Sequence, residues 1–213
     1  MALIITPLAF AVLGYGILAF SANSALKSFL SVWSIIATDT SLDTGDGYSD
    51  IYNGEKIAYD KDHIPSSAIT FPTLETRYGA ISINGSSIQD CPLFFGDTNK
   101  CLKNGVGQYA GSSFPGCGST VLIAGHNNGY FNGLKDVKTG DIITISTNYG
   151  TYEYRVTKTE LHNSTDSSAY DLTADKENIV LYTCYPFNAL GLTPQRFFVY
   201  GEYVSGPIVL LNE

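Results

Sequence analysis

The stretch that decides the fold is Ile179-Val-Leu-Tyr-Thr-Cys-Tyr-Pro-Phe-Asn-Ala-Leu-Gly-Leu-Thr-Pro-Gln-Arg-Phe-Phe-Val-Tyr200. Its apolar start predicts a strand that ends on Cys184. An eleven-residue loop with two prolines and a glycine follows, and a second apolar strand opens with Arg196. If the two strands form a hairpin they lie about 5 Å apart, so Cys184 and Arg196 are neighbours at one end of a sheet. A potential nucleophile beside a fixed cation indicates a catalytic site.

The composition favours a β-rich protein. The chain has 213 residues, which suits one modest domain with accessory segments. Only 15% of the residues are charged, while 21 glycines, 8 prolines, 15 tyrosines and 11 phenylalanines predict strands joined by many turns. The net charge of −8 and the lack of a basic stripe exclude nucleic acid as a partner. Four cysteines without a Cys-x-x-Cys pair predict neither a disulfide scaffold nor a zinc site, and nothing indicates a cofactor.

The N-terminal segment, residues 1–25, is predicted to be a membrane anchor. Leu3 to Phe20 is 18 residues without a charge, and as a helix it spans about 27 Å, close to the thickness of the hydrocarbon core. The alternative is a cleaved signal peptide, with small residues at Ser21–Ala25 as the cleavage region. Because no Lys or Arg precedes the apolar run, we favour the uncleaved anchor. The nearest basic residue, Lys27, follows the span and taken alone indicates a C-terminus inside the cell.

Residues 26–66 are predicted to be an accessory segment. Leu26 to Ala37 is amphipathic, and Asp39 to Asp50 is acidic and rich in Gly and Ser, which is typical of a linker. The spacing of Asp43, Asp46 and Asp50 also resembles part of a calcium loop. It lacks the terminal Glu of such a loop, so we favour a solvated linker.

Residues 67–205 are predicted to be a single β domain, followed by a tail at 206–213. No long segment after Ser67 has a helical period, and residues 163–176 read as a loop or short helix. Residues 97–118 are polar and Gly-rich. The fold class is mainly β, a closed or nearly closed barrel with short helices. The expected strands are Tyr78–Ile83, Cys91–Gly96, Thr120–Ala124, Asp141–Thr147 and Thr151–Thr159, of which the last two flank the turn residues 148–150 as a hairpin.

A third polar residue completes the candidate site. His126 follows a continuous apolar strand, as Cys184 does. If those strands run parallel, the imidazole and the thiol emerge at the same rim, with Arg196 beside them. A thiol is a strong nucleophile, an imidazole exchanges protons near neutral pH, and a guanidinium stabilises a developing oxyanion. Each residue alone has an ordinary structural explanation, but their joint occurrence at strand ends favours acyl transfer.

These residues lie in segments that resemble the sortases, the cysteine transpeptidases of Gram-positive bacteria. The resemblance runs from about Tyr78 to Tyr203, and the Cys-Tyr-Pro-Phe run with its Pro-x-Arg-Phe continuation is most similar to class D sortases. Val180 stands where the family usually has Thr, which is a conservative departure. The matching segments are Leu93–Gly96, Gly105–Gly111, Pro115-Gly116, Ala124–Asn127, Phe131–Leu134, Gly140-Asp141, Leu181–Pro186 and Thr193–Val199.

The resemblance implies a sortase-type β-barrel and a two-step reaction. Cys184 attacks the Thr carbonyl of a Leu-Pro-x-Thr-Gly-like sorting signal on a surface protein and forms a thioacyl enzyme. His126 acts as general acid and base, and Arg196 stabilises the substrate and the oxyanion. An amine of a cell-wall precursor such as lipid II then takes the acyl group, or alternatively a pilin lysine in pilus assembly. Calcium dependence stays open.

The resemblance also implies binding positions and a location. Thr183, Tyr185, Pro186 and Asn127 flank the reactive residues and are expected to bind substrate, with loops 163–178 and 185–195 as the groove walls. Sortases are single-pass membrane proteins with the N-terminus inside and the barrel outside the cell, and we adopt that topology, although the family's positive N-terminal flank is missing here.

Several alternatives remain open. Another cell-wall cysteine enzyme is disfavoured, because an L,D-transpeptidase needs a Ser-His-Gly-Cys-x-Arg run and a papain-like enzyme has its Cys before its His. A non-catalytic, membrane-anchored β-barrel binding module is the alternative from a different class. Cys91 and Cys101 are close enough in sequence for a disulfide, although we favour free thiols. His63 and His162 show no partner pattern and are expected to be surface or structural residues.

Overall fold

The structure is a computed structural model that describes residues 48–54, 62–187, 189, 191 and 193–211. The predicted membrane helix at 3–20, the amphipathic segment at 26–37 and most of the acidic linker lie outside these residues. Within the described ranges, no helix is both long and apolar enough to cross a membrane. From the linker, Asp50 is described, and its carboxylate pairs with the guanidinium of Arg77 at 3.2 Å.

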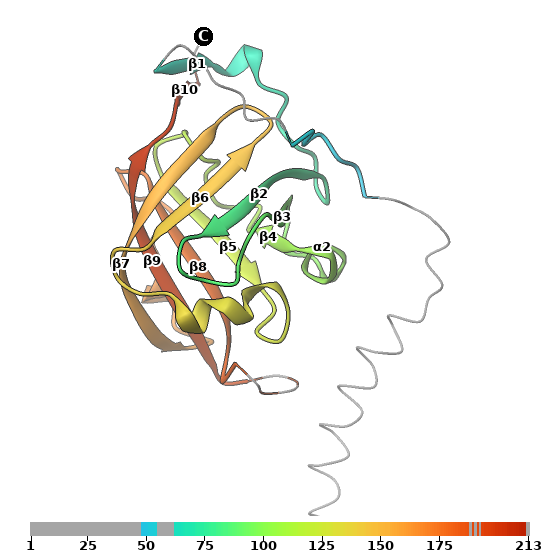
Figure 1. The fold of residues 1–213 in the computed structure, drawn as a ribbon. Helices are drawn as coiled ribbons and strands as arrows, with labels where there is room; N and C mark the ends of the chain where they lie inside the picture. Colours follow the sequence, from blue (N-terminus) through green and yellow to red (C-terminus); the bar gives the residue numbers. More distant parts are fainter. Residues whose placement is uncertain (1–47, 55–61, 188, 190, 192, 212–213) are drawn as a thin grey trace, which may run out of the picture. The chain divides into compact units, whose positions relative to one another are not determined.

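Eight strands close into a barrel, which confirms the predicted fold class (Figure 1). Around the barrel their order is β2-β3-β4-β5-β8-β9-β7-β6. The only α-helix of the described residues is short, and three 3-10 turns accompany it. The strands are β2 (Arg77–Ile83), β3 (Cys91–Phe95), β4 (Val106–Gln108), β5 (Thr120–Gly125), β6 (Ile142–Thr147), β7 (Thr151–Asn163), β8 (Asn178–Tyr185) and β9 (Gln195–Ser205), and the helices are α2 (Asn99–Asn104), η1 (Ser66–Ala68), η2 (Tyr130–Asp136) and η3 (Ser167–Ala169).

The predicted hairpin is present, and it is longer than the alternation in sequence indicated. β6 and β7 pair in antiparallel fashion through residues 142–146 and 151–155. β7 continues to Asn163, past the predicted end at Thr159, because its second half pairs with β9 instead of β6. The far end of β7 therefore reaches the region of Arg196.

Two layers of apolar side chains hold the barrel wall that carries the candidate site. Inward-pointing residues such as Ile123, Leu181 and Val199 join the main core inside the barrel. The alternate residues of the same strands point outward, because successive side chains of a strand face opposite ways. Leu122, Val180 and Phe198 form a second buried cluster there. This outer cluster must be covered by another part of the chain, and residues 169–172 cover it.

Strand β4 and helix α2 lie in the stretch at 97–118 that was predicted only as polar and Gly-rich. β4 has three residues, two of which flank Gly107. A side chain at Gly107 would collide with the main chain, because a Cβ there would lie 2.4 Å from the carbonyl oxygen of Gly96. Glycine weakens the sequence signal for a strand here, and it also lets the main chain of β4 approach the loop at Gly96 closely.

A small parallel sheet joins the two ends of the described domain. β1 (His63–Pro65) pairs with β10 (Ile208–Leu210). The pairing connects part of the predicted accessory segment to part of the predicted tail, and Ile64 and Val209 are buried in the main core. His63 itself is exposed on this sheet.

Glu177 connects the start of β5, which leads to His126, to the start of β8, which carries Cys184, through hydrogen bonds. Its carboxylate accepts hydrogen bonds from the backbone N–H groups of Gly116 at 2.9 Å and Gly118 at 3.0 Å, just before β5. It also accepts one from the hydroxyl of Tyr154 at 2.6 Å. One side chain directly before β8 therefore satisfies three donors.

We expect Glu177→Gln to lower the free energy of unfolding by about 2 kcal/mol, because charge-assisted bonds are lost and an amide N–H group faces one of the donors. Urea unfolding of the full chain measures the change. The matched control is Glu202→Gln, since Glu202 is exposed on β9. Equal midpoints for the two variants would contradict the structural role of Glu177.

Candidate active site

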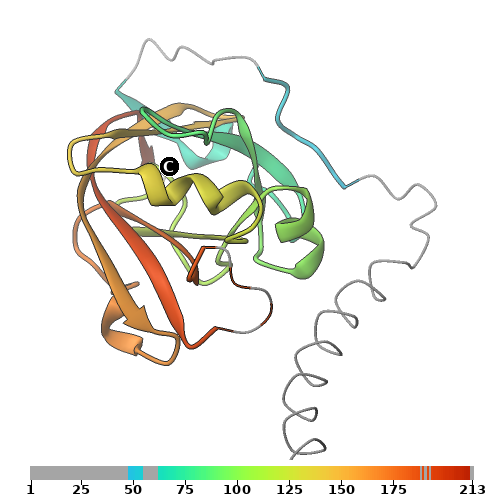
Figure 2. The same cartoon turned by 60° about the horizontal axis from the view of Figure 1, so that its bottom comes forward.

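The strand register brings the three predicted catalytic residues to one rim of the barrel. β5 and β8 are parallel, and Gly125 pairs with Thr183, so the next residues, His126 and Cys184, lie at the same end of this strand pair. β8 and β9 are antiparallel, and Cys184 is the direct partner of Arg196. Figure 1 shows these three strands adjacent in the wall, and Figure 2 turns the end where β8 stops toward the viewer. Both parts of the predicted geometry, the hairpin and the parallel strands, are confirmed.

Cys184 points out of the barrel. It is two residues after Tyr182 and four after Val180, which belong to the outer cluster, and alternation places all three side chains on the same face. Its thiol is free and half-buried. The position therefore combines access to a substrate with attachment to a rigid strand.

Burial raises the pKa of the other three cysteine thiols above its ordinary value. Cys91 and Cys101 are free and buried, so the structure forms no disulfide between them. Burial raises the pKa of Cys91 to about 12 and that of Cys117 to about 11, and it also raises the pKa of Cys101. Because the thiolate is the nucleophilic form, these three are poor nucleophiles near neutral pH.

His126 lies at the turn between β5 and η2. Its carbonyl accepts hydrogen bonds from the backbone N–H groups of Gly129 and Phe131, both at 3.2 Å, which fixes the turn. The preceding Gly125 has no room for a side chain, since a Cβ would lie 2.6 Å from the Phe131 ring. Desolvation by the surrounding protein lowers the pKa of His126 below its ordinary value of 6.5, although its side chain reaches solvent. At neutral pH the imidazole is therefore mainly neutral and able to accept a proton.

Arg196 is held by its own loop through one nitrogen. Nη1 donates to the carbonyl of Thr193 at 2.8 Å, to the hydroxyl of Thr193 at 3.3 Å and to the carbonyl of Gln195 at 2.9 Å. Among the described residues, Nε and Nη2 have no such partner. The guanidinium is thus oriented from one side and keeps donors for a ligand on the other side.

The side chains of two of the expected binding residues form hydrogen bonds within the protein. Thr183 is buried, and its hydroxyl donates to the carbonyl of Gly125 at 2.7 Å, which joins β8 to β5 beside the histidine. Asn127 is also buried, and its amide donates to the carbonyls of Pro186 at 2.8 Å and Ala189 at 3.3 Å. Both side chains hold the loops around Cys184 in place. Their contact with substrate stays a prediction.

The other two expected binding residues follow the nucleophile directly. Tyr185 is half-buried, and its ring meets the ring of Phe187 edge to face at 5.9 Å. Pro186 is exposed and is joined to Tyr185 by a cis peptide bond. Both are placed to meet a ligand that approaches Cys184, and substrate binding by them likewise stays a prediction.

An aromatic strip leads away from Cys184 and Arg196 on the outer face. The rings of Tyr182 and Tyr200 both stack with the ring of Phe198, with centroids at 5.5 and 6.0 Å. Ala169 of η3 packs against this strip and is buried. The backbone N–H of Ser164 donates to the carbonyl of Pro194 at 2.8 Å, which links the loop before β8 to the loop after it. The two predicted groove walls are therefore joined next to Arg196.

Sequence reasoning missed the position of His162. It was expected to be a surface or structural residue, and the structure adds that it is the direct partner of Arg196 across β7 and β9. Cys184, Arg196 and His162 thus form one row across three strands. The signal available in the sequence was the extension of β7, which the exposed Leu161 obscured.

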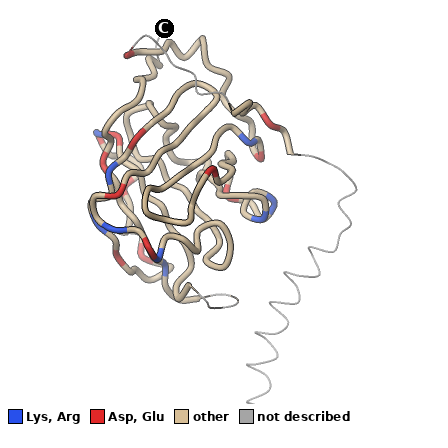
Figure 3. Tube along the Cα trace, viewed as in Figure 1, with Lys and Arg blue, Asp and Glu red and all other residues tan. Residues whose placement is uncertain are grey.

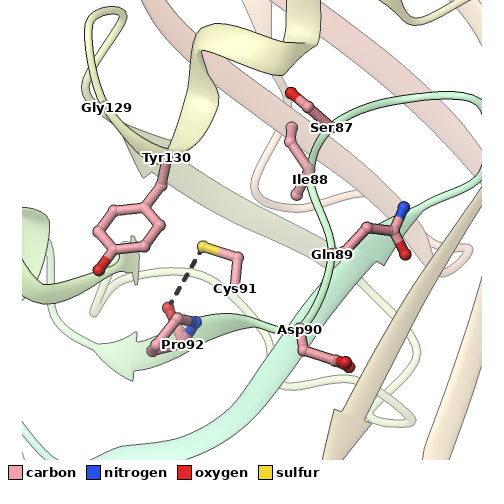
Figure 4. A pocket seen from close by; sticks show the side chains of 8 residues that line it. All are labelled: Ser87, Ile88, Gln89, Asp90, Cys91, Pro92, Gly129 and Tyr130. Carbon is pink, nitrogen blue, oxygen red and sulfur yellow. Dashed lines mark hydrogen bonds between the residues drawn. The ribbon is translucent and has the colours of Figure 1, made fainter.

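A separate cavity of about 400 Å³ opens on the other side of the histidine turn (Figure 4). The side chain of Tyr130 stands on one side of it and Cys91 faces it. None of the three predicted catalytic residues lines it. Its lining consists of residues 87–92, Gly129 and Tyr130.

Charged side chains are dispersed over the described chain. Lys and Arg alternate with Asp and Glu along the β7 and β9 side, and no stripe of one sign crosses the rim in this view (Figure 3). Arg196 is the guanidinium that the strand register places opposite Cys184.

Comparison with known proteins identifies the same segments. The family model described as the sortase domain matches residues 64–204. Sortase D of Bacillus subtilis (strain 168) is 31% identical over 116 residues, which is 54% of this chain and 59% of that protein. The chain thus spans about three fifths of the length of this curated relative.

Solved structures of sortases share the fold. A Clostridium perfringens sortase D5 transpeptidase superposes with a TM-score of 0.55 at 20% identity, over 62% of this chain and 82% of that one. Sortase C1 of Streptococcus agalactiae gives 0.54 at 29% identity, over 61% and 68%. Sortase A of Listeria monocytogenes gives 0.54 at 27% identity, over 62% and 89%.

Proposed function

Because the chain belongs to the sortase family, we propose that it is a cysteine transpeptidase that cleaves a Leu-Pro-x-Thr-Gly-like sorting signal and transfers the protein to an amine. The observation that carries this proposal is the register that sets Cys184 opposite Arg196 and next to the residue after Gly125. Nucleophile, proton carrier and fixed cation meet on rigid strand ends, as acyl transfer requires. A binding module has no need of this arrangement.

In the first step neutral His126 accepts the proton of the Cys184 thiol, and the resulting thiolate attacks the Thr carbonyl carbon. The carbonyl oxygen takes the negative charge, and the free donors of Arg196 stabilise it. When the tetrahedral intermediate collapses, the Thr–Gly C–N bond breaks, and protonated His126 gives its proton to the leaving amine. The product of this step is a thioester between Cys184 and the sorting signal.

In the second step an amine attacks the thioester carbonyl. Neutral His126 accepts the proton from the attacking amine, the C–S bond breaks, and the imidazolium returns that proton to the Cys184 thiolate. The lowered pKa of His126 favours this neutral form at pH 7. The pair of steps exchanges one amide bond for another, with no net change in protonation of the enzyme.

The proposed partners are surface proteins with such a sorting signal and a cell-wall amine, lipid II being the first candidate. The likeness to sortase C2 of the Group B Streptococcus pilus island 1, a structure at 26% identity, supports a pilin lysine as the second candidate acceptor. We place the enzyme at the cell membrane with its barrel outside, anchored by the uncharged run at residues 3–20. The sorting signal and both acceptors are found on that side.

The test is to incubate the full chain with a fluorogenic peptide that contains Leu-Pro-Glu-Thr-Gly or Leu-Pro-Asn-Thr-Ala, with and without a glycine-based amine. We expect cleavage after Thr and, with amine present, a new amide product in the mass spectrum. A lysine-containing pilin peptide as acceptor distinguishes the two acceptor classes. Absence of cleavage for every Leu-Pro-x-Thr peptide would overturn the proposal.

A further inference from the structure

His162 is enclosed by two carboxylates. Its Nδ1 lies 2.8 Å from Oδ2 of Asp166, and its Nε2 lies 3.2 Å from Oε2 of Glu160. Its side chain is only 20% exposed. A carboxylate can only accept hydrogen bonds, so both contacts are satisfied together when both ring nitrogens carry a proton. The surroundings therefore fit the imidazolium form of His162.

Other charged or titratable groups near the ring do not change this conclusion. The hydroxyl of Tyr200 lies 3.3 Å from Nε2, but burial raises the pKa of Tyr200 to about 12, so it is neutral. Lys158 pairs with Glu160 at 2.9 Å on the solvent side. Arg196 is the strand partner of His162, and its described hydrogen bonds go to its own loop. The hydrogen bonds that its ring donates to Asp166 and then to Glu160 raise the pKa of His162.

Asp166 connects this ring to the wall of the aromatic strip. The second oxygen of Asp166 accepts hydrogen bonds from the backbone N–H of Ser168 at 3.0 Å and from its hydroxyl at 2.6 Å, which starts η3. Ala169 then packs into the outer cluster, and its carbonyl accepts the hydroxyl of Tyr200 at 2.7 Å. The protonated ring thus holds the segment at 164–169 onto the sheet through one carboxylate.

We propose that protonated His162 is a positioning residue that docks the 164–169 segment as the wall of the substrate groove beside Arg196. When His162 loses its proton, one ring nitrogen presents a lone pair to a carboxylate, and the docked wall is weakened. Because the wall contacts substrate but no reacting atom, the effect falls on KM and not on kcat. The expected effect on KM rests on the proposed function. The docking of residues 164–169 rests on the hydrogen bonds of His162 and Asp166 alone.

The sign of the pH dependence follows from the raised pKa. A histidine with a raised folded pKa contributes its stabilisation fully below its ordinary value of 6.5 and loses it as the pH rises through the folded pKa. We therefore expect the KM of the unmodified chain to be low at acidic pH and to increase above the pKa of His162. The lowered pKa of His126 separates the two histidines on the pH scale.

The kinetic test compares the full chain with His162→Gln and His162→Arg from about pH 5.5 to pH 8.5 on the fluorogenic peptide. At the acidic end we expect His162→Gln to raise KM about threefold at unchanged kcat, the size expected for exposed ion pairs. The ratio of the two KM values should approach one at the alkaline end. His162→Arg, which keeps a charged donor, should hold KM low over the whole range. The matched control is His63→Gln on the distant β1–β10 sheet.

A structural readout keeps the test independent of peptide cleavage. Since the chain has three histidines, single variants assign each imidazole in an NMR titration. We expect the ring of His162 and the amide of Ser168 to follow one midpoint above 6.5, and Ser168 to lose that titration in His162→Gln. If this coupling is seen without peptide cleavage, the proposed function fails and the docking role stands. A midpoint below 6.5, an uncoupled Ser168 amide, or a KM ratio that is constant with pH would overturn the inference.

Discussion

Cys184→Ala is expected to lower kcat/KM for a sorting-signal peptide by about 10⁴-fold or more, because without the sulfur no covalent intermediate forms. The residue lies at the end of a well-paired strand, so the substitution removes a half-buried thiol and leaves the register of β8 intact. Thermal unfolding of the variant should match that of the unmodified chain. Equal cleavage by the two proteins would show that another group is the nucleophile.

We also expect the thiol of Cys184 to be the one that an alkylating reagent modifies. Burial raises the pKa of the other three cysteines, and the side chains of Cys91 and Cys101 are buried. Brief treatment with iodoacetamide near neutral pH should therefore add one group, located at Cys184 by peptide mass spectrometry. The matched control is Cys117→Ala, which removes a partly exposed thiol and should leave both cleavage and the single modification unchanged. Modification at Cys117 in the folded protein would contradict the assignment.

The geometry of the site was largely predictable from the sequence because it depends on strand ends. Cys184 and Arg196 terminate two apolar runs separated by a loop with Pro and Gly, and a hairpin places such residues opposite each other. His126 follows a run that is apolar on both faces, which is typical of a strand inside a parallel arrangement. In each case the predicted catalytic residue lies at the end of a strand whose apolar pattern is clear in the sequence.

The row that includes His162 was not predictable in the same way. β7 pairs with β9 through two register shifts, near Glu153 and near Val156. A shift of one residue reverses the face of every later side chain, so alternation in the sequence does not carry through to residue 162. The contact with Asp166 depends in turn on the course of an irregular loop, for which the sequence has no periodic signal.

Asn127 has a structural role that its place in the sequence did not reveal. It was expected at the substrate because it follows His126, and the structure buries its amide against two carbonyls of the loop after Cys184. Spacing alone does not show that a residue next to the histidine forms hydrogen bonds across the site, and its contact with substrate stays a prediction. Likewise β4 is too short and too rich in Gly for its pairing to appear before the strands around it are placed.

We expect Arg196→Lys to lower kcat/KM by about 10²-fold while the fold stays intact. Nη1 donates its hydrogen bonds to Thr193 and Gln195. The guanidinium still has the N–H groups of Nε and Nη2 to donate to the oxyanion and the substrate. A lysine has one nitrogen on a flexible stem. It must either keep the bonds to the loop and turn away from the substrate, or reach the substrate and release the loop.

The matched control is Arg155→Lys, because Arg155 is exposed on β7 and lies on the same sheet. We expect this control to keep normal kcat/KM, and both variants to show the circular dichroism and thermal midpoint of the unmodified chain. Dividing the loss into kcat and KM then locates the role of Arg196. A fall in kcat indicates stabilisation of the oxyanion in the transition state, whereas a rise in KM alone indicates that the guanidinium holds the substrate equally in both states. Near-normal kcat and KM for Arg196→Lys would show that the bidentate donor pair is not used.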